Sequence, residues 1–195
     1  MIYANLNIVV IGDSLSAGYG LKKKEVWVDL LSSRITSKEL PYTIINASIS
    51  GDTTAGGRQR LPTLIKNLSP NIVIIELGGN DGLRGLSLKA IEKNLEAMIK
   101  LCQSHHIDIL LIGIQLPPNY GPSYTNQFSQ VFVDLAKKTN VPLLPSLLAG
   151  LEDNFELFQT DGIHPTAVAQ PIILENVWQA LSPLLTDHDV TLSRK

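Results

Sequence analysis

Five short apolar runs divide the chain, and polar or turn-forming residues bound each of them. Their lengths and their β-branched content predict strands at about Asn5–Ile11, Tyr42–Asn46, Ile72–Leu77, Ile107–Ile114 and Val141–Leu144. The third run is apolar almost throughout, which is typical of a strand buried on both faces of a sheet.

Between these runs, apolar residues recur every three or four positions, the spacing of one face of a helix. This spacing predicts helices over about 26–37, 61–68, 88–102, 128–135 and 173–184. Pro62 is expected to start or kink the second of them. Strands that alternate with helices predict a parallel sheet with helices on both faces, joined by right-handed crossovers. Because no repeat or linker interrupts the pattern, we expect a single α/β domain over residues 1–195, with Thr186–Lys195 as a frayed tail.

Composition narrows the classes of function. The 195 residues are 44% hydrophobic and 17% charged, with a formal net charge of −2. These proportions are ordinary for a globular protein. The weak negative charge gives no electrostatic basis for binding nucleic acid. No segment approaches the roughly 18 apolar residues of a membrane span, so no stable membrane insertion is expected.

Two features bear on the compartment in which the protein works. Cys102 is the single cysteine and shares a helical stripe with Met98 and Ile99, so we expect a buried structural thiol and no intrachain disulfide. The first residues show neither the basic region nor the long apolar run of a signal peptide. Both a cytoplasmic protein and the mature form of an exported one are therefore compatible with the sequence.

Three of the predicted strands end in turns of small and polar residues. Asp13 and Ser14 follow the first strand, a turn containing Gly51 follows the second, and a glycine-rich turn containing Asn80 follows the third. In α/β proteins, ligands bind outside the carboxyl ends of the parallel strands, which share one edge of the sheet. We therefore expect these turns to meet in space.

A fourth polar element, Asp161-Gly-Ile-His164, precedes the last predicted helix. A serine hydroxyl needs a base to become a nucleophile, and histidine titrates near neutrality. An aspartate on the other ring nitrogen sets the tautomer and stabilises the imidazolium. Gly162 permits a tight turn that brings the two side chains together. The sequence thus offers a nucleophile, a base and an orienting acid.

An oxyanion formed by attack of Ser14 would need donors already in place. The N–H groups of Ser14 and Gly51 and the side-chain amide of Asn80 are candidates.

Each candidate also has a purely structural interpretation. Asp13 and Ser14 are residues of the kind that cap helices. Gly51 would supply a positive φ, and Asn80 would tolerate the left-handed conformation of a turn. A lone loop histidine such as His164 is most often simply solvated. All of these residues are expected at the same strand ends, and this coincidence favours a functional site over separate structural roles.

Two other classes of function stay open at this point. A metallophosphoesterase would use the side chains of Asp13, Asp52, Asp81 and His164. Two-metal sites need several histidine and aspartate ligands, and a single histidine lies near the strand ends. A non-catalytic nucleotide-binding module is the second alternative, but the glycines after the first strand do not match Gly-x-Gly-x-x-Gly.

Several stretches resemble the sequence blocks of the SGNH, or GDSL, hydrolase family. They are GDSL at residues 12–15, Gly51, GGND at 78–81, LPPNYG at 116–121 and DGIH at 161–164. The likeness runs from about Ile8 to Leu185 and is strongest to bacterial members that act on acyl thioesters, lysophospholipids and aryl esters.

The resemblance implies a three-layer α/β/α sandwich of flavodoxin-like type with a five-stranded parallel sheet. It implies Ser14 as nucleophile, His164 as base and Asp161 as the third member, with an oxyanion hole formed by Ser14, Gly51 and Asn80. It further implies a monomeric periplasmic enzyme that acts on a small acyl ester or thioester, with no cofactor and no metal.

A fatty acyl group would need an apolar groove beside this site. Residues 82–86 and 115–124 supply candidates for its wall, although the same side chains could equally pack these loops down. The residues expected to bind substrate are Asp13, Leu83, Leu116, Pro117, Tyr120 and Ile163.

Overall fold

A single parallel sheet forms the centre of the molecule. The computed structural model describes residues 6–192, with side chains for 6–185. The strands are β1 (Leu6–Gly12), β2 (Tyr42–Asn46), β3 (Ile72–Glu76), β4 (Asp108–Ile112) and β5 (Leu143–Leu144). They lie in the order β2-β1-β3-β4-β5, which is the order of flavodoxin-like folds. In register, Ile8 of β1 pairs with Ile44 of β2 and with Ile72 of β3.

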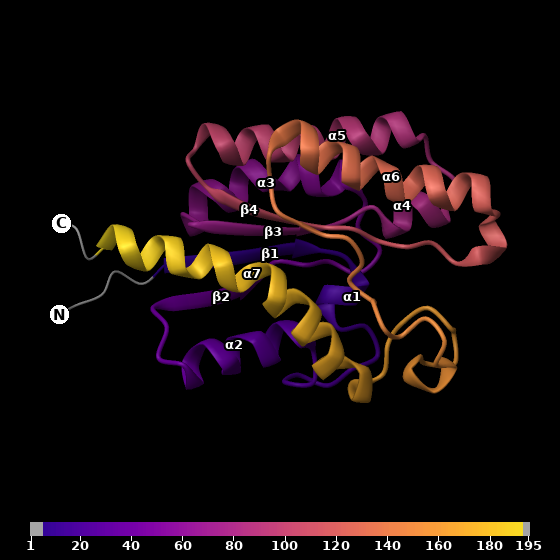
Figure 1. Ribbon diagram of the computed structural model, residues 1–195, viewed down its shortest axis with the longest axis horizontal. Coiled ribbons are helices and arrows are strands. Elements are labelled where there is room, and N and C mark those ends of the chain that lie inside the picture. The colour runs from indigo at the N-terminus through magenta and orange to yellow at the C-terminus, as the bar shows by residue number, and fades with distance from the viewer. Residues whose placement is uncertain (1–5, 193–195) are drawn as a thin grey trace.

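Helices cover both faces of the sheet, which makes three layers (Figure 1). One face carries α3 (Thr54–Leu68), α5 (Leu88–Ser104) and α6 (Pro122–Thr139), and the other carries α2 (Trp27–Ser37) and α7 (Gln170–Leu192). Shorter pieces are the helices α1 (Ser14–Ala17) and α4 (Gly79–Leu83) and the 3-10 helices η1 (Pro118–Tyr120), η2 (Phe155–Leu157) and η3 (Ala167–Ala169). The predicted five-stranded α/β/α sandwich is confirmed.

The period-2 alternation of the strands divides the core into two clusters. Ile8 and Val10 of β1 pack in the cluster that includes α2 and α7, whereas Val9 and Ile11 pack in the cluster that includes α3, α5 and α6. All four side chains are fully buried, and such burial contributes about 1.5–3 kcal/mol for each residue. Cys102 lies in the second cluster, where burial raises the pKa of its thiol to about 12. This confirms the buried structural thiol.

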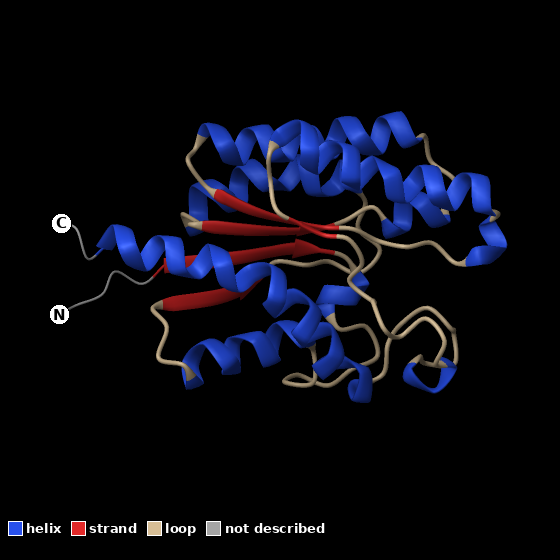
Figure 2. Cartoon of the chain, in the orientation of Figure 1, coloured by secondary structure: helices blue, strands red, loops and turns tan. Residues whose placement is uncertain are grey.

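The strand order places the candidate site. The chain passes from β1 to β2 on one side and then crosses to β3 on the other, so the order reverses between β1 and β3. Ligands bind at such a switch point. The strand arrows in Figure 2 point to the end of the sheet where the loops gather. Ser14 follows β1, Asn80 follows β3, and the loop containing Gly51 follows β2, so three neighbouring strands deliver them to one edge.

Three segments differ from their predicted structure. Residues 78–82 were expected to form a turn, but Gly78, with φ of 123°, redirects the chain into the one-turn helix α4. Helix α3 starts before Pro62, because Thr53 caps it by accepting a hydrogen bond from the N–H of Gly56 at 3.2 Å. Helix α7 is continuous through Leu192, since no glycine or proline interrupts residues 186–192; residues 193–195 lie outside the described part, and the frayed tail from Thr186 stays a prediction.

Membrane insertion is tested by helix length and hydropathy. Within the described residues, none of the helices combines the length and the apolar character that crossing a bilayer requires.

Candidate active site

Ser14 is the first residue of α1, immediately after β1. Asp13 caps this helix, since its Oδ1 accepts a hydrogen bond from the N–H of Leu15 at 3.0 Å. The turn is tight because Gly12 has no side chain: a Cβ there would lie 2.6 Å from Glu76 Oε2. The half-buried Ser14 therefore stands at a helix N-terminus, with a backbone N–H that has no acceptor within the helix.

The loop that carries His164 is a closed hairpin with its own internal hydrogen bonds. An antiparallel bridge joins Phe158 to Pro165 at its base, and Gly162 turns the tip with φ of +68°. The Oδ1 atom of Asp161 accepts hydrogen bonds from the N–H groups of Ile163 at 2.9 Å and His164 at 3.0 Å. One carboxylate oxygen thus holds the loop, and the other is left to face the imidazole.

Three side chains form a continuous hydrogen-bonded line. His164 Nδ1 lies 2.7 Å from Asp161 Oδ2, and His164 Nε2 lies 2.8 Å from Ser14 Oγ. Burial raises the pKa of Asp161, but the hydrogen bonds from His164 and Ile163 outweigh burial and bring this pKa down to about 2. An ionised Asp161 assigns the ring proton to Nδ1 and leaves Nε2 as the acceptor for the serine hydroxyl. The line can therefore remove a proton from Ser14.

Tyr19 is a neighbour of this line that the sequence did not single out. Its ring lies over the imidazole of His164, with centroids 4.4 Å apart and planes tilted by 37°. The carbonyl of Tyr19 accepts a hydrogen bond from Gln159 Nε2 at 2.8 Å, which ties the histidine loop to the segment after α1. No spacing rule signals this contact, because it depends on how residues 159–165 fold back over α1.

Asn80 and the loop of Gly51 follow β3 and β2, the two strands that flank β1 in the sheet. Asn80 Nδ2 donates to Asp13 Oδ2 at 3.1 Å, which occupies one of its two N–H bonds. Asn80 is helical rather than left-handed, so turn geometry does not account for it. Gly51 has φ of +80°, as its structural interpretation required. Within the described residues, the N–H of Gly51 has no hydrogen-bond acceptor.

A pair of buried acids lies beneath this edge of the sheet. Glu76 Oε2 accepts hydrogen bonds from Ser16 Oγ at 2.6 Å and from the N–H of Asp13 at 3.3 Å, while Oε1 has no partner among the described residues. Burial, reinforced by the charge of Asp13, raises the pKa of Glu76 well above its usual value. Burial also raises the pKa of Asp13 to about 6. Both carboxyls are therefore harder to ionise than exposed acids, and Glu76 retains its proton to a higher pH than an ordinary glutamate.

The buried acid predicts a pH dependence of stability. Above the ordinary glutamate pKa, the unfolded chain releases a proton that folded Glu76 retains, so rising pH favours unfolding. We expect Glu76→Gln, which keeps the neutral shape, to lose less stability than wild type as the pH rises from 5 to 8. Each pKa unit corresponds to about 1.4 kcal/mol, so denaturant titration at both pH values resolves the difference. Parallel losses in the two proteins would contradict this prediction.

The carboxylates required by a metallophosphoesterase are already engaged by protein donors. Asp52 Oδ2 accepts from Arg60 Nε at 2.8 Å. Asp81 accepts from the N–H and Oγ1 of Thr54 at 2.9 and 2.6 Å. No cluster of three or more histidine, cysteine, aspartate or glutamate side chains within the described part of the chain is arranged to hold a metal ion. The donor set does not support the metal alternative.

The predicted groove residues divide into exposed and buried groups. Tyr120 and Ile163 are exposed, Leu83 and Pro117 are half-buried, and the hydroxyl of Tyr120 donates to the carbonyl of Leu83 at 3.0 Å. Leu116 is instead part of the core.

Two of the side chains predicted to bind substrate are buried rather than exposed. Leu116 is only 7% exposed, because the missing side chain of Gly82 leaves room for it next to Phe128. It therefore does not form an exposed wall. Asp13 is 2% exposed, and its carboxylate binds Asn80 and caps α1 instead of facing solvent.

Comparison with known proteins gives the class that this fold and site define. The profile of the GDSL-like lipase/acylhydrolase family matches residues 10–170. The chain belongs to this family and is an SGNH-type hydrolase that acts on ester bonds.

Individual relatives share most of their length with this chain. Esterase TesA of Pseudomonas aeruginosa is 47% identical over 178 residues, which cover 91% of this chain and 89% of the relative. Thioesterase 1/protease 1/lysophospholipase L1 of Escherichia coli K12 is 41% identical over 182 residues, 93% of this chain and 86% of the relative.

Solved structures agree with this assignment. A crystal structure of TesA superimposes with a TM-score of 0.89 and covers 91% of this chain and 99% of that one. The psychrotrophic esterase EstA from Pseudoalteromonas, inhibited by monoethylphosphonate, is 38% identical with a TM-score of 0.88, covering 94% and 100%.

Proposed function

We propose that the protein hydrolyses carboxylic esters and thioesters through an acyl-enzyme on Ser14, with His164 as the base and Asp161 as the group that orients it. The observation that carries this proposal is the unbroken line of 2.7 and 2.8 Å contacts from Asp161 through His164 to Ser14. Ser14 Oγ attacks the carbonyl carbon as its proton passes to Nε2. The same proton then goes to the leaving alcohol or thiol, and water repeats the sequence on the acyl-enzyme.

The oxyanion of each tetrahedral intermediate needs fixed donors in a site that excludes water. We assign this role to the N–H of Ser14, the N–H of Gly51 and the second N–H of Asn80. Within the described residues, the first two have no protein acceptor in the helix or turn, and Asn80 is held by its hydrogen bond to Asp13. Their delivery by the adjacent strands β1, β2 and β3 supports the assignment.

The substrate class is inferred from the relatives and from the exposed apolar residues near the site. The relatives are named esterase, arylesterase and thioesterase/lysophospholipase, and we assign the same ester and thioester chemistry to this chain. The acyl chain would lie against Leu83, Pro117, Tyr120 and Ile163. A monomer is sufficient, because every residue of the site comes from one chain. The resemblance of the sequence blocks to this family supports a periplasmic location, which cell fractionation would test.

Covalent labelling tests the proposal directly. Incubation with a fluorophosphonate should add a single adduct by intact mass, and peptide mapping should locate it on Ser14. A p-nitrophenyl ester should be hydrolysed before labelling and not after it. Activity should be unchanged by EDTA. An adduct on any other residue, or activity that requires an added metal ion, would overturn the assignment.

Asn80 provides a prediction about the oxyanion hole. Asn80→Gly removes one donor and should lower kcat by about 10²–10³, with KM little changed, because the contact strengthens only in the transition state. Asn80→Asp should be worse, since it places a carboxylate where negative charge develops. Both substitutions also remove the hydrogen bond that Asn80 donates to Asp13, which could unfold part of the sample. Rates are therefore expressed per site titrated with the fluorophosphonate, so that unfolded protein is not counted. A wild-type kcat in Asn80→Gly would exclude its amide from the hole.

Tyr120 provides a prediction about the acyl groove. It is 38% exposed and its hydroxyl bridges to the carbonyl of Leu83. Tyr120→Ala should reduce kcat/KM for decanoyl esters by about 10-fold relative to acetyl esters, since apolar pockets discriminate by about 1–3 kcal/mol per methylene. The measurement is a series of p-nitrophenyl esters of increasing chain length. An equal loss for all chain lengths would assign Tyr120 to loop stability alone.

A further inference from the structure

The loop that carries Gly51 lies beyond the end of β2, so contacts from outside that strand must hold it in place. Strand β2 ends at Asn46 and helix α3 begins at Thr54, so the intervening residues belong to neither element. The N–H of Ile49 donates to the carbonyl of Gly12 at 3.0 Å, which fastens the middle of this loop to the end of β1. Its two ends are held by a side chain of α3.

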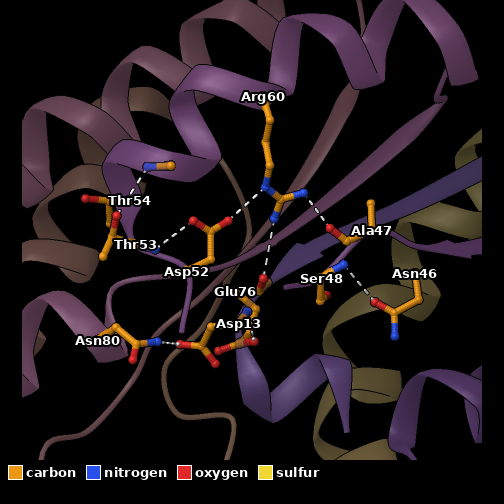
Figure 3. A network of polar contacts seen from close by, with 12 residues as sticks. Asp13, Asn46, Ala47, Ser48, Asp52, Thr53, Thr54, Arg60, Glu76 and Asn80 are labelled. Atoms are coloured by element: carbon orange, nitrogen blue, oxygen red, sulfur yellow. Dashed lines mark hydrogen bonds and ion pairs between the residues drawn. The ribbon is translucent and has the colours of Figure 1, made fainter. Parts of the chain in front are cut away.

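That side chain is Arg60, whose guanidinium bonds to three segments (Figure 3). Its Nε donates to Asp52 Oδ2 at 2.8 Å, and its Nη1 donates to the carbonyl of Ala47. Its Nη2 lies 3.4 Å from the carbonyl of Gly12. Ala47 and Asp52 stand on either side of residues 48–51, and Gly12 precedes Ser14 by two residues. One rigid group therefore joins the loop of Gly51 to the turn of Ser14.

The surroundings of Arg60 are built to hold this arrangement. The side chains of Arg60 and Asp52 are only 19% and 11% exposed. Asp52 Oδ1 accepts a hydrogen bond from the N–H of Thr53 at 2.8 Å. The same oxygen fits beside α3 because Gly56 has no side chain: a Cβ there would lie 2.0 Å from Asp52 Oδ1. A charge pair this far from water is retained only when its hydrogen bonds are satisfied. The planar fork of arginine spreads its donors over a rigid plane and so reaches acceptors on three separate segments, whereas the three donors of a lysine ammonium radiate from a single atom.

We propose that Arg60 is a positioning residue that sets the separation of the Ser14 and Gly51 N–H groups and thereby tunes stabilisation of the oxyanion. This inference rests on the proposed function, since it assigns a role within the same oxyanion hole. Arg60 acts through the loop backbone and makes no contact with substrate. A shift of about 1 Å in a catalytic group can lower the rate by about 10².

The test uses Arg60→Lys, with Arg34→Lys as the matched control. Arg34 forms an ion pair with Glu175 between α2 and α7, on the opposite face of the sheet. We measure kcat and KM for p-nitrophenyl butyrate, per fluorophosphonate-titrated site, and Ki for a trifluoromethyl ketone, which mimics the tetrahedral oxyanion. Arg60→Lys should lower kcat by about 10–10² and leave KM within about threefold. The Ki of the ketone should rise by the same factor by which kcat/KM falls. Arg34→Lys should match wild type in all three.

Several outcomes decide against the proposal. Wild-type kcat and Ki in Arg60→Lys would overturn it. So would a loss of activity that disappears when rates are expressed per titrated site, because Arg60 would then act on folding alone. If Arg60→Lys does not fold, Asp52→Asn takes its place. This substitution weakens the contact of Arg60 with residue 52 and leaves the guanidinium bonded to the carbonyls of Ala47 and Gly12. Failure of the proposed function looks different, because wild type itself would then neither hydrolyse the ester nor accept the label on Ser14.

Discussion

Replacing Ser14 with alanine is expected to lower kcat for ester hydrolysis by about 10⁶, the scale of loss when the nucleophile of a serine–histidine pair is removed. The hydroxyl is where the acyl group would be attached, and its hydrogen bond is to His164. The fold should persist, because Ser14 is half-buried and Asp13 still caps α1. The measurement is kcat on a p-nitrophenyl ester beside a thermal melt.

Ser33→Ala is the control for this experiment, since Ser33 is an exposed serine of α2 whose hydroxyl donates to the carbonyl of Asp29. It should retain wild-type activity. If Ser14→Ala kept more than about one-thousandth of wild-type kcat with the same melting curve, another nucleophile would have to be sought.

Asp161→Asn is expected to lower kcat by about 10⁴ while leaving the histidine loop intact. Asparagine keeps an oxygen in the place of Oδ1, which accepts the N–H groups of Ile163 and His164. Its amide nitrogen would face His164 Nδ1 in the place of Oδ2 and favour the tautomer that carries its proton on Nε2. That tautomer cannot take the proton of Ser14.

The pH profile provides a second measurement on the same pair. Because the pKa of Asp161 is lowered to about 2, Asp161 stays ionised throughout the working range, so a fall of kcat/KM on acidification should not come from this carboxylate. In Asp161→Asn, turnover near that of wild type would require a different third member.

The fold and the polar strand ends could be predicted because both follow from local patterns. An apolar run such as 72–77 predicts a buried strand, and parallel strands bring Ser14, Gly51 and Asn80 to one edge whatever their separation in sequence. Asp161 and His164 are only three residues apart, so a glycine between them is enough to suggest their contact.

The remaining features depend on tertiary packing, which no local pattern reports. Leu116 has the same character as an exposed groove residue and is buried only because Gly82 leaves a space. Tyr19 meets His164 through the docking of a distant loop. Arg60 lies on a helix whose spacing identifies its apolar face but not the carbonyls that a long polar side chain reaches.

The contact between Ser14 and His164 joins residues that are 150 positions apart in the chain. During synthesis at about 5–20 residues per second, the serine turn emerges roughly 8–30 s before its histidine has been made. A nascent or prematurely terminated chain consequently holds an inert hydroxyl, however well its first strands have formed. Ser14 therefore becomes reactive only when residues 159–165 dock on α1. Activity therefore reports that the chain has been made and folded as far as the loop of His164.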